Sequence, residues 1–189
     1  MGKKYYLMKN KIAVSIVNYN TSYETVNCLK SIEKLNINNK LKIFLVDNCS
    51  EDNSIVELKE YINEHADLEI ELIQSSYNSG FAAGNNLSIK KAMDEGFPYI
   101  LLLNNDTLVK ENIFEKAIKF FDRNKDCSII TFLTKNLNGN NEHYSTRNRP
   151  SFSNLLFLYH SPFWDKKWFP GFKKHYMLNN GHNRKDSFK

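Results

Sequence analysis

The sequence predicts an α/β fold in which a mainly parallel sheet is covered by helices on both faces. Two observations predict it: apolar strand-like stretches alternate with helical patterns four times, and the connections between them are short. This alternation is typical of parallel sheets, because a helix makes the crossover from each strand to the next. At 189 residues, the chain is long enough for one domain with a substantial core.

The first two strands are expected at 12–17 and 41–46, where runs of apolar residues suit strands buried on both faces. Each is followed by an apolar helical stripe, and a capping-box pattern precedes each stripe. The two capping pairs are Thr21 with Glu24, and Ser54 with Glu57.

The second half of the alternation has weaker strands. Residues 68–73 alternate apolar and acidic side chains, which favours a strand nearer an edge of the sheet. A helix should follow from Ala82 to Met93, and Gly96 is well placed to end it. The remaining expected elements are a strand at 99–103, a helix at 111–123 and a fifth strand at 128–134.

The pattern breaks down after about residue 135, so we expect a core at 1–134 and an irregular segment at 135–189. The core carries 16 Lys and Arg against 18 Asp and Glu, whereas the segment carries 10 against 3 and holds nine aromatic residues between 152 and 176. We interpret this basic, aromatic segment as subdomain packing, with a membrane- or acceptor-binding surface as the alternative. Nucleic-acid binding is not expected, because no recognisable module accompanies the charge.

Three cysteines without close spacing argue against a disulfide framework or a zinc site, and fit a reducing cytoplasm. The apolar stretch near the start spans only six residues, 12–17. This is too short for a secretory signal or for a membrane span of about 20 residues. The sequence therefore predicts a cytoplasmic protein.

Three polar stretches follow expected strands: Asn18-Tyr19-Asn20, Asp47-Asn48-Cys49-Ser50 and Asn104-Asn105-Asp106. In parallel α/β sheets, ligands bind at the carboxyl ends of the strands, so all three are candidates for one site. Asn and Asp also cap helices and form turns, and any one of these stretches taken alone is more readily structural. Three of them on successive strand ends favour a binding site.

The chemistry of this edge is limited by what the sequence lacks. It has no glycine-rich dinucleotide fingerprint, no P-loop and no nucleophile elbow. Phosphate binding would therefore rely on a metal and a carboxylate. Asp106 suits Mg²⁺ or Mn²⁺, which share their oxygen ligands between one or two carboxylates and the phosphates of a ligand. Asp47 could accept hydrogen bonds from a base or a ribose, and Gly80 and Gly84 would let backbone approach a ligand.

Four stretches, in this order and spacing, resemble the N-terminal half of family 2 glycosyltransferases, and more narrowly a rhamnosyltransferase-like branch. They are VSIVNYNTSYETVNCLKSI, IFLVDNCSEDNSIVEL, NSGFAAGNNLSIKKAMDEG and YILLLNNDTLV. The resemblance covers about residues 11–134 and implies a GT-A (Rossmann-like) fold. It also implies inverting transfer of a sugar from a nucleotide diphosphate, assisted by Mg²⁺ or Mn²⁺.

The resemblance also implies roles for individual residues. Asp106 would hold the metal, as the last residue of a DXD-like motif. The residues implied in nucleotide-sugar binding are Val17, Asn18, Tyr19, Asp47, Asn48, Ser50, Gly80, Asn85, Asn86, Asn104 and Asn105. The donor would be a UDP- or dTDP-sugar such as dTDP-rhamnose, and the acceptor would be a glycan or a lipid-linked acceptor. The setting would be bacterial cell-surface polysaccharide synthesis at the inner face of the cell membrane.

Two departures from the family pattern bear on function. Asn104 replaces the first acid of the DXD motif, which makes one contact neutral. The later acidic motif that supplies the general base is not recognisable. The only acids of the sequence after Asp126 are Glu142, Asp165 and Asp186, and none of them lies in a Glu-Asp-type motif. No general base can be named, so an alternative reading is a truncated, non-catalytic fragment that binds the nucleotide sugar.

Overall fold

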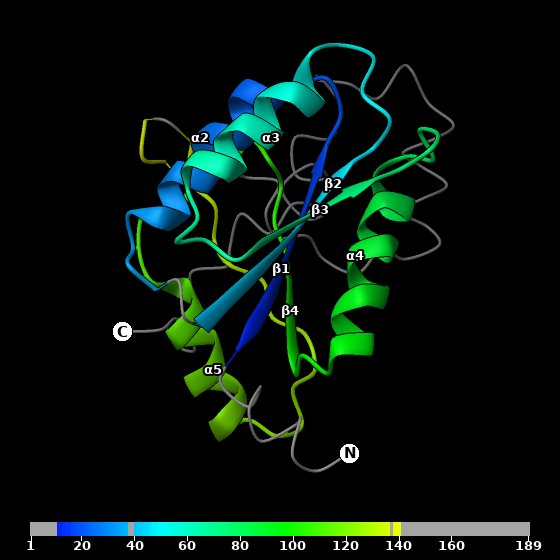
Figure 1. Cartoon of the computed structure of the whole chain (residues 1–189). Coiled ribbons are helices and arrows are strands. Elements are labelled where there is room, and N and C mark those ends of the chain that lie inside the picture. The colour runs from blue at the N-terminus through cyan, green and yellow to red at the C-terminus, as the bar shows by residue number, and fades with distance from the viewer. Residues whose placement is uncertain (1–10, 38–39, 137, 141–189) are drawn as a thin grey trace, which may run out of the picture. The chain divides into compact units, whose positions relative to one another are not determined.

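The computed structural model describes residues 11–37, 40–136 and 138–140 (Figure 1). By its contacts the chain divides into two units, Met1–Cys127 and Ser128–Lys189, and the fold described below belongs to the first. The boundary expected between residues 134 and 135 remains a prediction. The helices and strands of the first unit follow in the order β1 (Ile12–Asn18), α2 (Ser22–Glu33), β2 (Leu41–Asp47), α3 (Ser54–Glu64), β3 (Ile70–Gln74), α4 (Phe81–Glu95), β4 (Tyr99–Leu102) and α5 (Ile113–Arg123).

The four strands form one parallel sheet in the order β3-β2-β1-β4. The predicted parallel α/β sheet is confirmed, and so is the position of β3 at an edge. The expected fifth strand at 128–134 is wrong: no strand of the described sheet pairs with this stretch, and Ile129 is 87% exposed. A strand needs both a hydrogen-bonded neighbour and a face to bury, and apolar composition alone provides neither.

Helices cover both faces of the sheet, as predicted. Figure 1 shows α2 and α3 side by side on one face and α4 on the other. Successive side chains of a strand point to opposite faces, so Ile12, Val14 and Ile16 of β1 join the core under α2, whereas Ala13 joins the cluster under α4. All seven residues of β1 are buried, because the strand has neighbours on both edges and helices on both faces.

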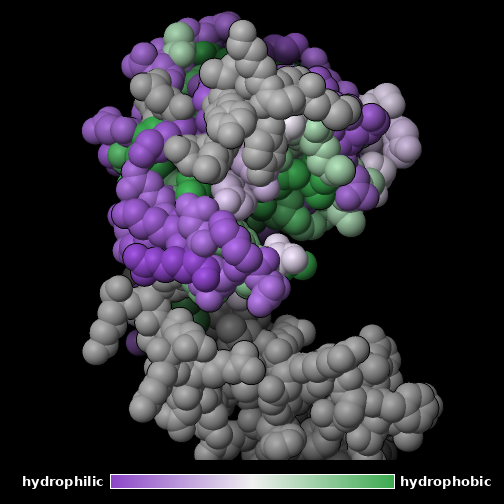
Figure 2. All heavy atoms as spheres, turned by 90° about the horizontal axis from the view of Figure 1, so that it is seen from below, coloured by the Kyte–Doolittle hydropathy of each residue, from purple (hydrophilic) through white to green (hydrophobic). Residues whose placement is uncertain are grey.

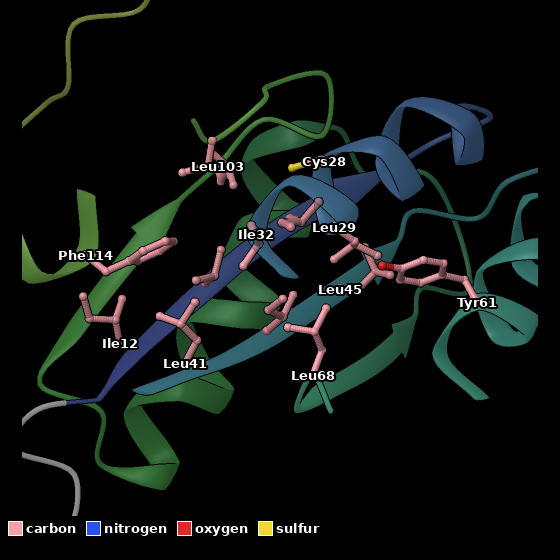
Figure 3. Packing of buried hydrophobic residues seen from close by; sticks show 14 of the residues in the cluster. Ile12, Cys28, Leu29, Ile32, Leu41, Leu45, Tyr61, Leu68, Leu103 and Phe114 are labelled. Atoms are coloured by element: carbon pink, nitrogen blue, oxygen red, sulfur yellow. The ribbon is translucent and has the colours of Figure 1, made fainter. Parts of the chain in front are cut away.

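The larger core lies between the sheet and helices α2, α3 and α5. Figure 3 shows Leu29 and Ile32 of α2 above Ile12 of β1 and Leu41 of β2, with Phe114 of α5 beside them. Leu29 and Ile32 are fully buried, so the predicted apolar stripe of this helix is confirmed. Burial of Leu29 and Ile32 removes apolar surface from water, at about 25 cal/mol per Å², and so stabilises α2 on the sheet.

The smaller cluster holds α4 against the opposite face. Phe44 of β2 meets Phe97 edge to face at 5.9 Å between ring centroids, and Ala13 and Ala92 complete the contact. Lys42 lies on the same face, where its Nζ is 2.7 Å from Glu95 of α4 and 2.8 Å from Glu71 of β3. Apolar packing and one ion-pair group thus fix the far end of α4.

The helix ends depart from two of the predicted caps. Thr21 and Asn53 are the cap residues of α2 and α3, but neither side chain caps its helix. The capping boxes expected at Thr21 and Ser54 are therefore wrong, because the Thr21 hydroxyl turns toward Asn18 and Tyr19 and Ser54 is already inside α3. Gly96 ends α4 in the left-handed conformation with φ 83°, as predicted.

The described surface is mainly hydrophilic. In Figure 2, hydrophilic residues cover most of the coloured area, with a smaller hydrophobic area beside them. No helix within the described ranges is both long enough and apolar enough to span a bilayer.

Candidate functional site

The carboxyl ends of β1, β2 and β4 lie at the same edge of the sheet, because all three strands are parallel neighbours. Asn18 at the end of β1 pairs in register with Asp47 at the end of β2. The ladder continues beyond β4, where Leu103 N donates to Ser15 O at 2.9 Å. The three Asx-rich stretches predicted from the sequence therefore leave the sheet next to one another.

Asn18 and Asp47 form the centre of this edge. The Asn18 side chain is fully buried and Asp47 is 3% exposed. Asn18 Nδ2 donates to Asp47 Oδ1 at 2.9 Å and to Ser50 Oγ at 3.1 Å, and Ser50 Oγ donates to the same Asp47 oxygen at 2.6 Å. Within the described part of the chain, Asp47 Oδ2 accepts one bond, from Ser50 N at 3.1 Å. The first oxygen is thus saturated, and the second retains accepting capacity.

The loops after β1 and β2 are held to each other. Asn20 N donates to Ser50 Oγ at 3.0 Å, and Glu51 N donates to Asn20 Oδ1 at 2.8 Å. Asn20 and Cys49 both adopt positive φ, 54° and 65°, which only a well-supported turn maintains in residues other than glycine.

Asn48 connects the same edge to the segment before α4. It is 2% exposed, and its Nδ2 donates to Asn78 Oδ1 at 2.7 Å. Gly80 N donates to the same oxygen at 2.9 Å. The Oδ1 of Asn48 is buried and has no hydrogen-bond partner in the described part of the chain. Gly80 has φ 84°, so the turn into α4 needs a residue without a side chain.

Asn104, Asn105 and Asp106 follow β4 and differ in how they are held. Asn105 is half-buried, and its Nδ2 donates to Thr21 Oγ1 at 2.7 Å and to Thr25 Oγ1 at 2.9 Å. Asn104 and Asp106 on either side of it are exposed. Among the described residues, no hydrogen bond or ion pair holds the Asp106 carboxylate or the Asn104 carboxamide. The middle residue fixes the loop, and the two flanking residues present oxygen atoms to solvent.

The Asp106 carboxylate affects one buried group. Cys28 of α2 lies under this loop, with its Sγ 3.8 Å from Asn104 O. Burial, and next the negative charge of Asp106, raise the pKa of Cys28 to about 12. Cys28 therefore stays a neutral thiol and a packing residue at physiological pH.

Val17 and Tyr19 of the first predicted stretch have different surroundings. Val17 is 7% exposed, and Gly84 of α4 lies so close that a Cβ on it would be 2.9 Å from Val17 Cγ1. Tyr19 is 39% exposed at the carboxyl edge. Of the two, Tyr19 has a surface that a ligand could reach, and Val17 packs α4 against β1.

Asn85 and Asn86 of α4 also separate into a buried and an exposed residue. Asn85 is 4% exposed, accepts from Ser15 Oγ at 2.8 Å and donates to Phe81 O at 3.0 Å. Asn86 is exposed. Asn85 therefore links the start of α4 to β1, and Asn86 is available to a ligand.

Thr21 and Thr25 were missed by the reasoning from sequence, although they join the loops of this edge. Thr25 is fully buried, and its Oγ1 donates to Asn18 Oδ1 at 2.8 Å. The available signal was the four-residue spacing of two threonines, which places them on one face of a helix beside an Asn-rich strand end.

The described residues contain no group of three or more His, Cys, Asp or Glu side chains that could bind a metal by itself. The donor set at the third loop, the Asp106 carboxylate with the Asn104 carboxamide, consists of oxygen atoms. It fits Mg²⁺ or Mn²⁺, provided that a ligand supplies most of the coordination shell.

A family model described as Glycosyl transferase family 2 matches residues 13–183. No curated protein matches the chain significantly. Among solved structures, residues 1–349 of S. aureus TarS in complex with UDP-GlcNAc match with a TM-score of 0.53 and 23% identity, over 61% of this chain and 32% of that one.

A mannosyltransferase, PcManGT from Pyrobaculum calidifontis in complex with GDP-Man and Mn2+, matches with a TM-score of 0.50 and 18% identity, over 57% of this chain and 31% of that one. At this identity the likeness shows a shared fold. The matched part of this chain corresponds to about a third of either protein. The parallel α/β architecture is that of a GT-A fold. Since the family model spans nearly all of the sequence, the chain belongs to glycosyl transferase family 2.

Proposed function

We propose that the carboxyl edge of the sheet binds a nucleotide-diphosphate sugar together with a divalent cation, and that it is the donor side of a glycosyltransferase. One observation carries the proposal: a continuous hydrogen-bond network holds the loops after β1, β2 and β4 together, while Asn104 and Asp106 remain exposed beside it. Family membership supports sugar transfer. The solved structure of S. aureus TarS contains UDP-GlcNAc, and that of PcManGT contains GDP-Man and Mn2+.

Asp106 is the proposed metal ligand, and Asn104 a neutral neighbour for the sugar or the metal. One carboxylate is enough because the diphosphate supplies further oxygen ligands to Mg²⁺ or Mn²⁺. When bound, such a cation neutralises charge on the departing diphosphate. The exposed Asp106 carboxylate is available for this role, since no side chain of the described residues engages it.

Asp47, Tyr19 and Asn86 are the proposed contacts to the rest of the donor. The second carboxylate oxygen of Asp47 can accept from a base N–H or a ribose hydroxyl, because among the described residues it carries only the bond from Ser50 N. Tyr19 offers an exposed ring at the same edge, and Asn86 an exposed carboxamide. Gly80 allows backbone to approach the ligand.

Within the family, we place the chain in the rhamnosyltransferase-like branch, on the four motifs of its sequence. That placement implies a UDP- or dTDP-sugar donor such as dTDP-rhamnose, inversion at the transferred carbon, and a glycan or lipid-linked acceptor. It also implies a role in bacterial cell-surface polysaccharide synthesis at the inner face of the cell membrane.

The test is calorimetric titration with UDP, dTDP and GDP, each with and without Mn²⁺. We expect one diphosphate to bind with micromolar affinity in Mn²⁺ and at least tenfold more weakly without it. The corresponding nucleoside monophosphate is the control, because it lacks the second phosphate that completes the metal site. Absence of Mn²⁺-dependent binding for all three diphosphates would refute the proposal.

A second candidate is donor binding without transfer by this chain alone. It is favoured by the length of the match, about a third of the two solved neighbours, and by the lack of a residue that we can name as general base. It predicts nucleotide binding without release of nucleoside diphosphate from the matching sugar nucleotide in the presence of glycan acceptors. Measurable turnover would exclude it.

A further inference from the structure

The buried hydrogen bonds at the carboxyl edge form one directed chain from the loop after β4 to the end of β2. Asn105 Nδ2 donates to Thr25 Oγ1 at 2.9 Å, and Thr25 Oγ1 donates to Asn18 Oδ1 at 2.8 Å. Asn18 Nδ2 then donates to Asp47 Oδ1 at 2.9 Å. Four side chains from four elements or loops are thus linked in sequence.

The direction of this hydrogen-bond chain is fixed by the chemistry of its Asp47 end. An ionised carboxylate can only accept, so Asn18 must present its amide nitrogen to Asp47 and its oxygen to Thr25. The single hydroxyl proton of Thr25 is then used on Asn18, which leaves the hydroxyl oxygen as an acceptor for Asn105. Thr21 O is a second acceptor for that proton, at the longer distance of 3.0 Å.

Residue 105 must therefore be a donor. Its two amide protons are both used, on Thr21 Oγ1 at 2.7 Å and on Thr25 Oγ1. A carboxylate in this position would face two hydroxyl oxygens, and one of their protons is already committed to Asn18. This explains why an amide lies between Asn104 and Asp106 in the loop.

Helix α2 holds the same loop at two further points. Cys28 Sγ lies 3.8 Å from Asn104 O, and Val109 N donates to Ser31 Oγ at 2.9 Å. The contacts from Thr21 to Ser31 run along one side of the helix, since they are spaced by three or four residues. The position of the Asp106 loop is thus set by α2 and, through Thr25 and Asn18, by Asp47.

We infer that Thr25 and Asn105 are positioning residues that couple the exposed Asp106 carboxylate to the buried Asp47 carboxylate, so that the metal side and the nucleotide side of the site are held in one geometry. The inference rests on the proposed function, since it assigns a purpose to the network within a donor-binding edge. Thr25 and Asn18 are both fully buried, so an unpaired group in the chain has no water to replace its partner.

The experiment compares Thr25→Val, which keeps the shape and removes the hydroxyl, with Thr25→Ser, which keeps the hydroxyl. Asn105→Ala removes the other donor, and Asn63→Ala on the exposed side of α3 is the matched control. Calorimetry gives the affinity of each for the diphosphate that the wild type binds among UDP, dTDP and GDP, with and without Mn²⁺. Circular dichroism melting establishes which variants are folded.

Thr25→Val and Asn105→Ala should each weaken binding in Mn²⁺ about tenfold, which corresponds to about 1.4 kcal/mol. Binding without Mn²⁺ should weaken less than threefold, because the Asp106 loop then contributes little. Thr25→Ser and Asn63→Ala should bind like the wild type. The double variant should lose no more affinity than the single variant with the larger loss, since both substitutions remove the same contact between Asn105 and Thr25.

Equal losses with and without Mn²⁺, or fully additive losses, would overturn the coupling and leave a role in stability alone. Unchanged affinities of both variants would also overturn it while the proposed function stands. A wild type that binds none of the three diphosphates would overturn the proposed function and this inference together. If Thr25→Val does not fold, Thr21→Val removes one of the two acceptors of Asn105, and its Mn²⁺-dependent loss should be about threefold; no loss would again overturn the coupling.

Discussion

Gly84 is the position where a single methyl group tests the packing of α4 on the sheet. A Cβ added there would be 2.9 Å from Val17 Cγ1 and 3.2 Å from Cγ2. Carbon atoms at optimal separation are about 3.5–4.0 Å apart, so either the helix or Val17 must move by roughly half an ångström. Val17 is β-branched, 7% exposed and inside a fully buried strand, so it has little freedom to give way.

The size of the effect follows from two opposing terms. Overpacking in a buried contact costs about 1–3 kcal/mol, and replacing an interior helix glycine with alanine returns about 1 kcal/mol. Gly84→Ala should therefore lower the free energy of unfolding by about 1 kcal/mol. In a Val17→Ala background the clash disappears, and the same substitution should raise it by about 0.5–1 kcal/mol.

The assay is urea unfolding followed by far-ultraviolet circular dichroism on all four proteins of this cycle. Equal slopes with shifted midpoints would show that stability alone has changed. We expect the effect of Gly84→Ala to change sign between the two backgrounds. The same sign in both, or stabilisation of the wild type by Gly84→Ala, would refute the close contact between α4 and β1.

Three further predictions concern stability and reactivity. Hydrogen bonds from Lys42 and Lys91 lower the pKa of Glu71, so the stability that Glu71 contributes is present above the ordinary carboxyl pKa and is lost as the pH falls through the lowered value. Glu71→Gln should cost about 1 kcal/mol at pH 7 and should reduce the loss of unfolding free energy between pH 5 and pH 3 in urea titrations. A pH profile identical to that of the wild type would contradict this. Gly96→Ala places a side chain at φ 83° and should cost about 1–2 kcal/mol in thermal unfolding, whereas no change in the melting temperature would exclude the left-handed end of α4. Cys28, with its pKa raised to about 12, should be the slowest thiol to alkylate at pH 8 by peptide mass spectrometry, and rapid labelling of the folded protein would show that it is not buried.

The parallel sheet and most of its elements could be predicted from the sequence, because hydrophobic period and length distinguish buried strands from amphipathic helices. Gly96 was predictable for a local reason, since a glycine after a helical pattern suits the left-handed end. The strand predicted at 128–134 was wrong because its apolar residues have strand propensity but no pairing partner in the described sheet. Strand pairing is a tertiary property, and local sequence does not contain it.

The candidate site was predictable as a place and less so in its detail. Parallel topology brings the Asx-rich strand ends together, as expected from the order of elements. The sequence did not reveal which amides face inward: Asn18, Asn85 and Asn105 are engaged in internal hydrogen bonds, whereas Asn86 and Asn104 are exposed. That distinction depends on side-chain partners from other elements.

The predicted helix cap at Thr21 failed for a similar reason, because side-chain partners from other elements decide its contacts. Thr21 matches a capping box in sequence, but its hydroxyl oxygen, which a cap would use to accept from helix N–H groups, accepts from Asn105 Nδ2 instead, while its proton faces Asn18 Oδ1 and Tyr19 O. Side-chain to backbone and side-chain to side-chain bonds have similar free energies, so the tertiary neighbour decides. The roles of Thr21 and Thr25 were missed because the four-residue spacing of the two threonines does not show which buried group each hydroxyl meets.

The central claim is that Asp106 holds a divalent cation against a bound nucleoside diphosphate at the carboxyl edge of the sheet. Electron paramagnetic resonance of free Mn²⁺ tests it most directly, with the nucleoside diphosphate alone as the reference for metal that binds the nucleotide without protein. The wild-type protein with the diphosphate should remove more free Mn²⁺ than the diphosphate alone, and Asp106→Asn should abolish the difference while leaving the melting temperature unchanged. If folded Asp106→Asn removes as much Mn²⁺ as the wild type, the metal is held elsewhere and the account is wrong.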